Sequence, residues 1–118
     1  MSSEDSLRDL KESLRQFAGD RDWDQFHTAS NLATALSVEI AELQEHFLWT
    51  SLSEVEEVVA AKRELIAEEI GDVLLYLIRL ADKVGVDPVA AAREKLKANA
   101  LKYPADKARG NHKKYTEL

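Results

Sequence analysis

Residues 65–75 read LIAEEIGDVLL, and residues 32–43 read LATALSVEIAEL. Both stretches repeat apolar residues at the three- and four-residue spacing of an α-helix. Each stretch also carries two acidic residues three positions apart: Glu39 with Glu42, and Glu69 with Asp72. Residues three apart on a helix share a face, so each helix directs its two carboxylates to the same side. The sequence therefore predicts an all-α fold in which two helices bring four acids together.

The composition limits the class of protein. The chain has 118 residues, of which 45% are hydrophobic and 32% charged, as in a folded helical protein. This length suits one domain, so we expect a single domain over residues 1–118. A net charge of −6 disfavours nucleic acid or an anionic membrane as the partner. The absence of cysteine excludes disulfides, thiolate metal sites and a thiol nucleophile.

Two further features concern location. The first residues, Met-Ser-Ser-Glu-Asp, lack the basic and apolar regions of a signal peptide. The longest uninterrupted apolar run, Val73–Ile78, is far shorter than the ~20 residues that span a bilayer. We therefore expect a cytoplasmic protein that does not bind membranes.

Apolar spacing and cap signals predict a four-helix antiparallel bundle with an irregular tail. The first two helices are expected from a cap at Ser2–Asp5 to about Gly19, and from about Ser30 to Trp49, with a loop at residues 21–27 between them. The third is expected to begin at a capping box of Ser53 and Glu56 and to reach Lys83, with Gly71 a possible bend. The fourth is expected to begin at Asp87-Pro88 and end before Pro104, and residues 104–118 are expected to be irregular.

Helical phasing at about 100° per residue tests whether the acids face inward. On the second helix, Glu39 falls on the line of Leu36 and Leu43, inside the apolar stripe, and Glu42 falls at its edge. On the third helix, Glu69, Asp72 and Tyr76 follow one flank of the apolar stripe, which consists of Ile66, Ile70, Val73, Leu77 and Leu80. Glu45 and Glu68 are expected to face solvent.

Acids three apart are also common on solvated helix faces, and this chain has 22 acidic residues. Two such pairs, one of them inside an apolar stripe, favour a metal site instead. An all-carboxylate set suits Mg²⁺, with Mn²⁺ possible. A di-iron bundle would require Glu-x-x-His, and His46 has Leu43 at that position.

Carboxylate-bound Mg²⁺ with open positions is suited to a polyphosphate. Lys95 and Asn99 share a helix face and offer donors to phosphate oxygens, although an exposed lysine is usually only solvated. A basic cluster in the tail has the same two interpretations: Arg109, Lys113, Lys114 and Tyr115. Trp23 and Trp49 could stack on a base and His27 could hydrogen-bond to one, or these side chains could serve packing alone.

The acidic pattern Glu39-x-x-Glu42 followed by Glu69-x-x-Asp72 resembles the metal-binding motif of MazG-like all-α nucleoside triphosphate pyrophosphohydrolases. Further motifs resemble the dCTP pyrophosphatase branch: Arg21-Asp-Trp-x-Gln-Phe-His27, Glu69-x-x-Asp72-Val-Leu-x-Tyr76-Leu, Tyr103-Pro-Ala and Lys114-Tyr-Thr-Glu-Leu118. The similarity covers nearly the whole chain. The connection after Trp49 is shorter than in the best-known members of that branch.

The resemblance implies Mg²⁺-dependent hydrolysis of the α–β phosphoanhydride of dCTP or a modified dCTP, giving dCMP and pyrophosphate by in-line attack of water. It implies that the metal ligands and catalytic residues are Glu39, Glu42, Glu69 and Asp72. The base and sugar would be bound by Trp23, His27, Trp49 and Tyr76, and the phosphates by Lys95, Asn99 and the basic tail. It also implies a homodimer or homotetramer.

Two alternatives remain open from the sequence. A related pyrophosphohydrolase could act on dUTP, a damaged nucleotide or phosphoribosyl-ATP. A helical interaction module without enzymatic activity would carry the same acids as solvated surface groups.

Overall fold

The computed structural model describes residues 3–118, with side chains from Ser6 onward, and all regular elements in that range are helical. The all-α prediction is confirmed, but the described part contains six α-helices where four were expected. The α-helices are α1 (Ser3–Asp20), α2 (Ala29–Glu45), α3 (Val55–Ala61), α4 (Arg63–Val84), α5 (Pro88–Lys102) and α6 (Ala105–Ala108). Two short 3₁₀ helices complete the set: η1 (Leu52–Glu54) and η2 (Tyr115–Glu117). The expected cap at Ser2–Asp5 lies outside the described side chains.

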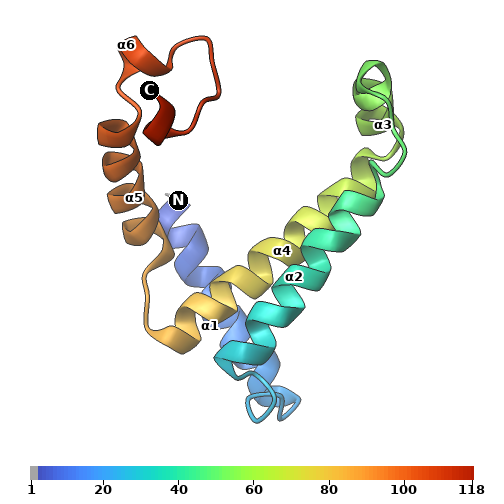
Figure 1. Cartoon of the computed structure of the whole chain (residues 1–118). Helices are drawn as coiled ribbons and strands as arrows, with labels where there is room; N and C mark the ends of the chain where they lie inside the picture. The colour runs from blue at the N-terminus through green and yellow to red at the C-terminus, as the bar shows by residue number, and fades with distance from the viewer. Residues whose placement is uncertain (1–2) are drawn as a thin grey trace. The chain divides into compact units, whose positions relative to one another are not determined.

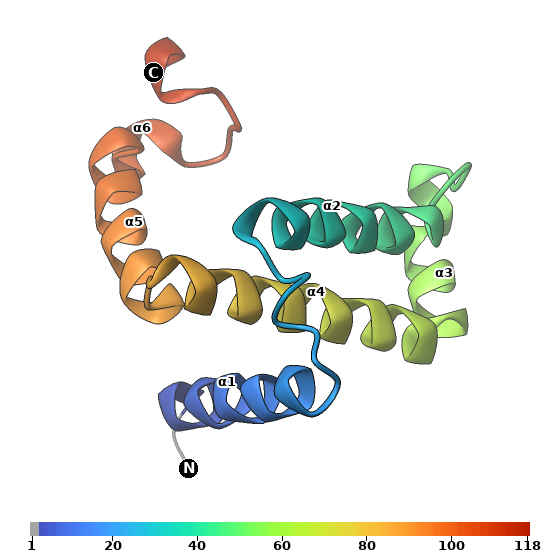
Figure 2. The ribbon, with the colours of Figure 1, turned by 90° about the horizontal axis from the view of Figure 1, so that it is seen from below.

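The chain divides into two compact units, one ending at Gly85 and one from Val86 to Leu118. In the first unit α4 lies between α2 and α1; it runs antiparallel to α2 and crosses α1 (Figures 1 and 2). Leu32 of α2 and Ile78 of α4 are almost fully buried, as are Ala18 and Ala81. These small and branched side chains let the three helices approach closely, and α4 thereby becomes the central element of the unit.

The second expected helix is shorter than predicted. Thr28 caps the start of α2, where its hydroxyl oxygen accepts from the backbone N–H of Asn31 at 3.1 Å. At the other end the N–H groups of Phe47 and Leu48 bond to carbonyls three residues earlier, and Trp49 takes a left-handed φ of 63°. Such tight turns satisfy the last carbonyls of a helix, so the α-helix ends at Glu45 and not at Trp49.

The third expected helix is two helices. The backbone leaves helical geometry at Lys62, which separates α3 from α4, whereas Gly71 lies inside an unbroken α4. The predicted capping box of Ser53 and Glu56 is wrong. Ser51 instead donates its hydroxyl to the Glu54 carboxylate across η1, and no side chain caps α3.

The fourth expected helix is confirmed as α5. The Asp87 carboxylate accepts from the N–H groups of Val89 and Ala90 at 3.0 and 3.1 Å, and Pro88 occupies the first turn. The tail is more ordered than predicted, because it contains α6 and η2. Its Tyr115 ring meets the Tyr103 ring edge-on, with 6.1 Å between the centroids.

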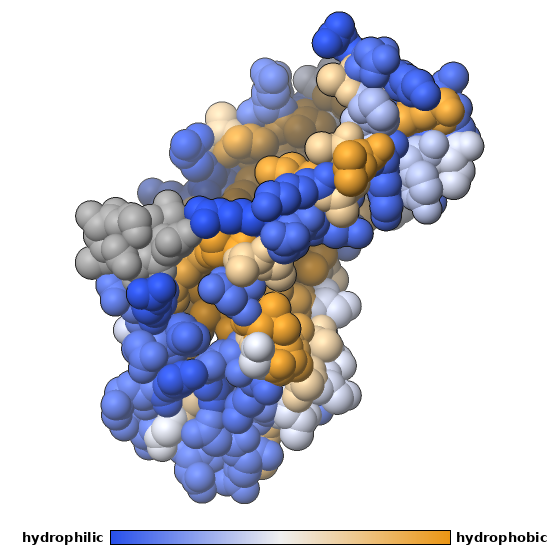
Figure 3. Space-filling model, turned by 90° about the vertical axis from the view of Figure 1, so that its left-hand side faces the viewer, coloured by the Kyte–Doolittle hydropathy of each residue, from blue (hydrophilic) through white to orange (hydrophobic). Residues whose placement is uncertain are grey.

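Many large apolar side chains reach the surface between hydrophilic ones, as the face in Figure 3 illustrates. On α4, Ile70, Leu74 and Leu77 are 53%, 39% and 42% exposed. Part of the stripe expected in the core therefore faces away from α2 and α1. Within the described residues, no helix combines the length and apolarity needed to cross a bilayer.

Candidate functional site

The cluster of acids lies between α2 and α4. One carboxylate oxygen from each of Glu39, Glu69 and Asp72 lies within 4.8 Å of the other two. Glu39 and Glu69 are half-buried and Asp72 is exposed, so the group opens to solvent on one side. The predicted phasing is therefore correct for these three acids. Glu45 and Glu68 are exposed, as expected.

The two half-buried acids are short of hydrogen-bond donors. The Oε2 atoms of Glu39 and Glu69 are buried without a partner among the described residues. Burial, followed by the neighbouring Glu42 charge, raises the pKa of both groups above the ordinary glutamate value. Asp72 adds to this effect on both carboxyls. The cluster thus concentrates negative charge that nothing in the described chain neutralises completely.

Glu42 is the fourth predicted acid, and its position differs from that of the other three. It is exposed and does not belong to the three-oxygen group. Its charge nevertheless helps to raise the pKa of both Glu39 and Glu69. Glu42 therefore borders the cluster and contributes charge to it.

His46 also lies beside the cluster, which the sequence reasoning did not predict. Its Nε2 is 3.7 Å from Oε1 of Glu69. This contact differs from the Glu-x-x-His pattern of di-iron bundles, in which a glutamate precedes the histidine by three residues on the same helix. A contact between residues on neighbouring segments leaves no local pattern in the sequence.

The donor set fits a hard divalent cation. Mg²⁺ and Mn²⁺ prefer oxygen ligands, and Mg²⁺ usually retains several waters beside one or a few carboxylates. Three converging carboxylate oxygens, two unpartnered buried oxygens and an open side meet that requirement. Glu39, Glu69 and Asp72 could hold such an ion.

The loop between α1 and α2 brings two predicted binding residues together. The Trp23 and His27 rings meet edge-on with centroids 6.2 Å apart, and the Phe17 ring lies 5.6 Å from Trp23. Backbone bonds from Trp23 to Ala18 and from His27 to Trp23 fix the course of the loop. Trp23 is 42% exposed, so part of this residue remains accessible. Tyr76, one turn beyond Asp72 on α4, is half-buried.

The sequence reasoning missed Arg79, which is buried at 5% exposure within α4. Its side chain contacts Asp24 and His27 of the loop and Asp82 of its own helix. One signal was available, because Arg79 follows Tyr76 by three residues on the flank that carries Glu69 and Asp72.

The roles of the remaining predicted binding residues stay predictions. Trp49 is 93% exposed after the end of α2. The predicted phosphate-binding residues belong to the second unit and are described within it alone: Lys95, Asn99, Arg109, Lys113, Lys114 and Tyr115. In that unit Lys95 is exposed and Asn99 half-buried on α5, and the Lys102 ammonium lies 5.0 Å from the centre of the Tyr115 ring.

Comparison with known proteins now identifies the class. Residues 34–118 match the MazG-like family, and the chain belongs to that family. The resemblance drawn from the acidic motif is therefore confirmed.

Individual proteins of known name or structure are also similar to this chain. Human dCTP pyrophosphatase 1 is 42% identical over 119 residues, which cover 99% of this chain and 70% of the human protein. The rat dCTP pyrophosphatase 1 is 40% identical with the same coverage. The crystal structure of a pyrophosphatase from Archaeoglobus fulgidus superimposes with a TM-score of 0.81 at 41% identity, covering 84% of this chain and 93% of that one.

Proposed function

We propose that this protein is a Mg²⁺-dependent nucleoside triphosphate pyrophosphatase that hydrolyses dCTP, or a modified dCTP, to dCMP and pyrophosphate. The observation that carries the proposal is the carboxylate cluster between α2 and α4, in which the buried oxygens of Glu39 and Glu69 have no partner among the described residues. Relatives named dCTP pyrophosphatase 1, 40–42% identical over almost the whole chain, support the reaction and the substrate.

In this proposal, Glu39, Glu69 and Asp72 hold the cation, and Glu42 supplies a fourth carboxylate at the border of the cluster. A bound divalent cation supplies positive charge to the phosphate oxygens and lowers the pKa of bound water. The open side at Asp72 admits the polyphosphate. Because the chain has no cysteine, attack by water is preferred to a thiol nucleophile.

The nucleotide base and sugar are assigned to Trp23, His27, Trp49 and Tyr76. The partly exposed Trp23 indole offers a stacking surface, and base–aromatic stacking contributes ~1–3 kcal/mol. The phosphates are assigned to donors and cations of the second unit: Lys95, Asn99, Arg109, Lys113, Lys114 and Tyr115.

The proposal includes a homodimer or homotetramer in the cytoplasm. Ile70, Leu74 and Leu77 are spaced along one side of α4 and remain partly exposed, which favours burial against a second copy. Light scattering coupled to size exclusion should give a mass of two or four chains. A mass near 13.3 kDa would reject the oligomer.

A nucleotide panel tests the function. Pyrophosphate release is measured with Mg²⁺ for dCTP, 5-methyl-dCTP, dUTP, dTTP and phosphoribosyl-ATP. The proposal expects dCTP or its 5-modified form to give the highest kcat/KM. A clear preference for another member of the panel would reject the substrate, and no release from any of them would reject the enzymatic proposal.

A further inference from the structure

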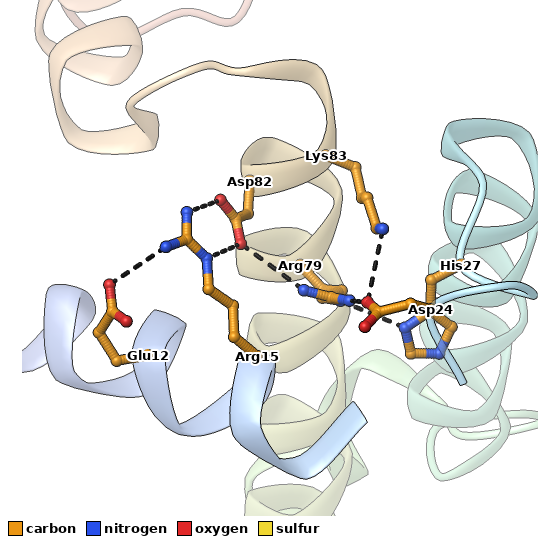
Figure 4. A network of polar contacts seen from close by, with 7 residues as sticks. All are labelled: Glu12, Arg15, Asp24, His27, Arg79, Asp82 and Lys83. Atoms are coloured by element: carbon orange, nitrogen blue, oxygen red, sulfur yellow. Dashed lines mark hydrogen bonds and ion pairs between the residues drawn. The ribbon is translucent and has the colours of Figure 1, made fainter. Parts of the chain in front are cut away.

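Arg79 of α4 contacts the loop between α1 and α2 through its guanidinium group (Figure 4). One terminal nitrogen pairs with the Asp24 carboxylate of the loop, and the other lies 3.6 Å from Oδ2 of Asp82. Its Nε–H donates to Nδ1 of His27 at 3.2 Å. Asp82 is also held by Arg15 of α1 through two bonds of 2.6 and 2.7 Å. The loop is therefore attached to α4 at a buried cation whose charge is balanced by carboxylates.

The contact between Arg79 and His27 determines where the imidazole carries its proton. A guanidinium Nε–H can only donate, so Nδ1 of His27 must be the acceptor. A neutral imidazole has one donor and one acceptor nitrogen, and the proton is therefore on Nε2. Protonation at Nδ1 would place two N–H groups against each other, beside a positive charge.

Burial and the nearby positive charges also favour the neutral His27 ring. Burial, and then the Arg79 charge, lower the pKa of His27; Lys83 adds to this effect and Asp24 opposes it. Lys83 lies 3.5 Å from Asp24, so most of the negative charge near the ring is already paired. The imidazole is thus kept neutral near pH 7.

The free nitrogen of the ring is then a donor with a defined direction. The Arg79 bond occupies Nδ1 alone, which leaves Nε2 available to another partner. Arg79 lies seven residues beyond Asp72, about 10 Å along the helix axis. This separation places the Arg79–His27 contact away from the acids but on the same flank of α4.

We propose that Arg79 is a positioning residue for nucleotide binding, which fixes His27 as the Nε2–H donor and holds the loop with Trp23 against α4. The proposal rests on the nucleotide function proposed above. His27 then serves an acceptor atom of the nucleotide, a phosphate or base-carbonyl oxygen, and not the exocyclic amino group of a base. Arg79 itself acts through His27 and the loop.

The tautomer is measured without any nucleotide. Long-range proton–nitrogen NMR correlations distinguish Nε2–H from Nδ1–H imidazoles, and a His27→Gln variant assigns the signals among the three histidines. The wild-type ring is expected to be neutral and protonated at Nε2 at pH 7. In Arg79→Leu, the Nδ1–H form should appear. A wild-type ring protonated at Nδ1, or a tautomer unchanged by Arg79→Leu, would overturn the inference whatever the enzyme's substrate.

Two further variants keep the test decisive. Arg79→Lys retains a charge beside Asp24 and Asp82 but lacks the planar Nε–H. This variant should therefore fold, even if Arg79→Leu unfolds, and the Nδ1–H form of His27 should appear in it. Arg15→Gln is the matched control, because it removes a partner of Asp82 without touching His27. Its His27 tautomer should equal that of the wild type. A changed His27 tautomer in Arg15→Gln would show that any loss of packing around Asp82 alters the tautomer, and it would overturn the specific role of Arg79.

Kinetics and titration connect the tautomer to the nucleotide. Arg79→Lys should raise the KM for dCTP about tenfold, the effect of one lost hydrogen bond, with kcat changed less than about threefold. A fall in kcat with KM unchanged would contradict a positioning role in binding. In the wild type, 2′-deoxycytidine or inorganic pyrophosphate should shift the Nε2–H signal. Because the first ligand has no phosphate and the second has no base, the one that shifts the signal identifies the acceptor. If neither ligand shifts the signal, His27 is not the donor to the nucleotide.

Discussion

Oε2 of Glu39 on α2 and Oε2 of Glu69 on α4 are buried in the same cluster, and neither has a hydrogen-bond partner among the described residues. A buried carboxylate oxygen without a donor is costly, because its hydration is lost and nothing replaces it. The cost falls on α2 and α4, the pair of described helices that packs most extensively. A bound cation is the simplest group that removes this cost.

Mg²⁺ should stabilise the protein, because it binds the folded cluster and not the unfolded chain. At an ion concentration about 100 times the Kd, the expected gain in free energy of unfolding is ~2.7 kcal/mol. A thermal melt with and without Mg²⁺ measures it as a rise in Tm of several degrees. Asp72→Asn should reduce the rise strongly, whereas Glu68→Gln, an exposed acid on the same helix, should retain it. Equal shifts in both variants would place the ion elsewhere.

Acid should weaken the protein through Asp82. The hydrogen bonds and charge of Arg15 hold the pKa of this carboxyl below the ordinary aspartate value, against the opposing effect of burial. A group with a lowered pKa in the folded state contributes stability above its unfolded pKa of ~3.9 and loses it as pH falls through the folded pKa. Asp82→Asn should therefore lower stability at pH 7 and flatten its loss below pH ~4.

Denaturant unfolding from pH 7 to pH 3 measures this difference. Arg15→Gln should reproduce it, because the partner is lost from the other side. Asp9→Asn, an exposed acid on α1, serves as control and should follow the wild type. Glu39 and Glu69, whose raised pKa values act in the opposite direction, are common to all these variants and cancel in the comparison. A parallel pH profile for Asp82→Asn would show that the ion pair is not stabilising.

The start of α5 should depend on Asp87. Removing its carboxylate in Asp87→Ala leaves the N–H groups of Val89 and Ala90 without their acceptor, which costs about 1 kcal/mol at a helix N-cap. Hydrogen exchange of these two amides should accelerate by about fivefold. Asp87→Asn, which also caps well, should remain close to the wild type. Unchanged exchange in Asp87→Ala would contradict the cap.

The sequence predicted the fold where strong local signals exist. Asp87-Pro88 and Pro104 correctly bound α5, and apolar spacing correctly gave the helical class. The break between α3 and α4 at Lys62 was not predicted, because no glycine or proline marks it in the sequence. The end of α2 depends on tight turns before Trp49 and not on a stop residue. The exposure of Ile70 and Leu77 was not predicted. An apolar stripe indicates a face that favours burial, but it does not indicate which part of the same chain, or which partner, covers that face.

In the candidate site, too, features of a single helix were predicted and contacts between distant segments were not. Phasing placed Glu39 inside the stripe and joined Glu69 to Asp72, since residues on one helix follow its period. The contacts of Glu69 with His46, and of Arg79 with Asp24 and His27, join segments far apart in the chain. Only the tertiary arrangement reveals such pairs. The predicted phosphate donors of the second unit stay a prediction.

In the proposed reaction the Glu39 carboxylate is required for pyrophosphate release from dCTP. The most direct measurement is the rate of that release with Mg²⁺ by wild type, Glu39→Gln and Glu45→Gln, with helicity checked by circular dichroism. We predict that Glu39→Gln loses turnover and keeps its helices, while Glu45→Gln, an exposed acid on the same helix, keeps both. Near-normal release by a folded Glu39→Gln would contradict the account.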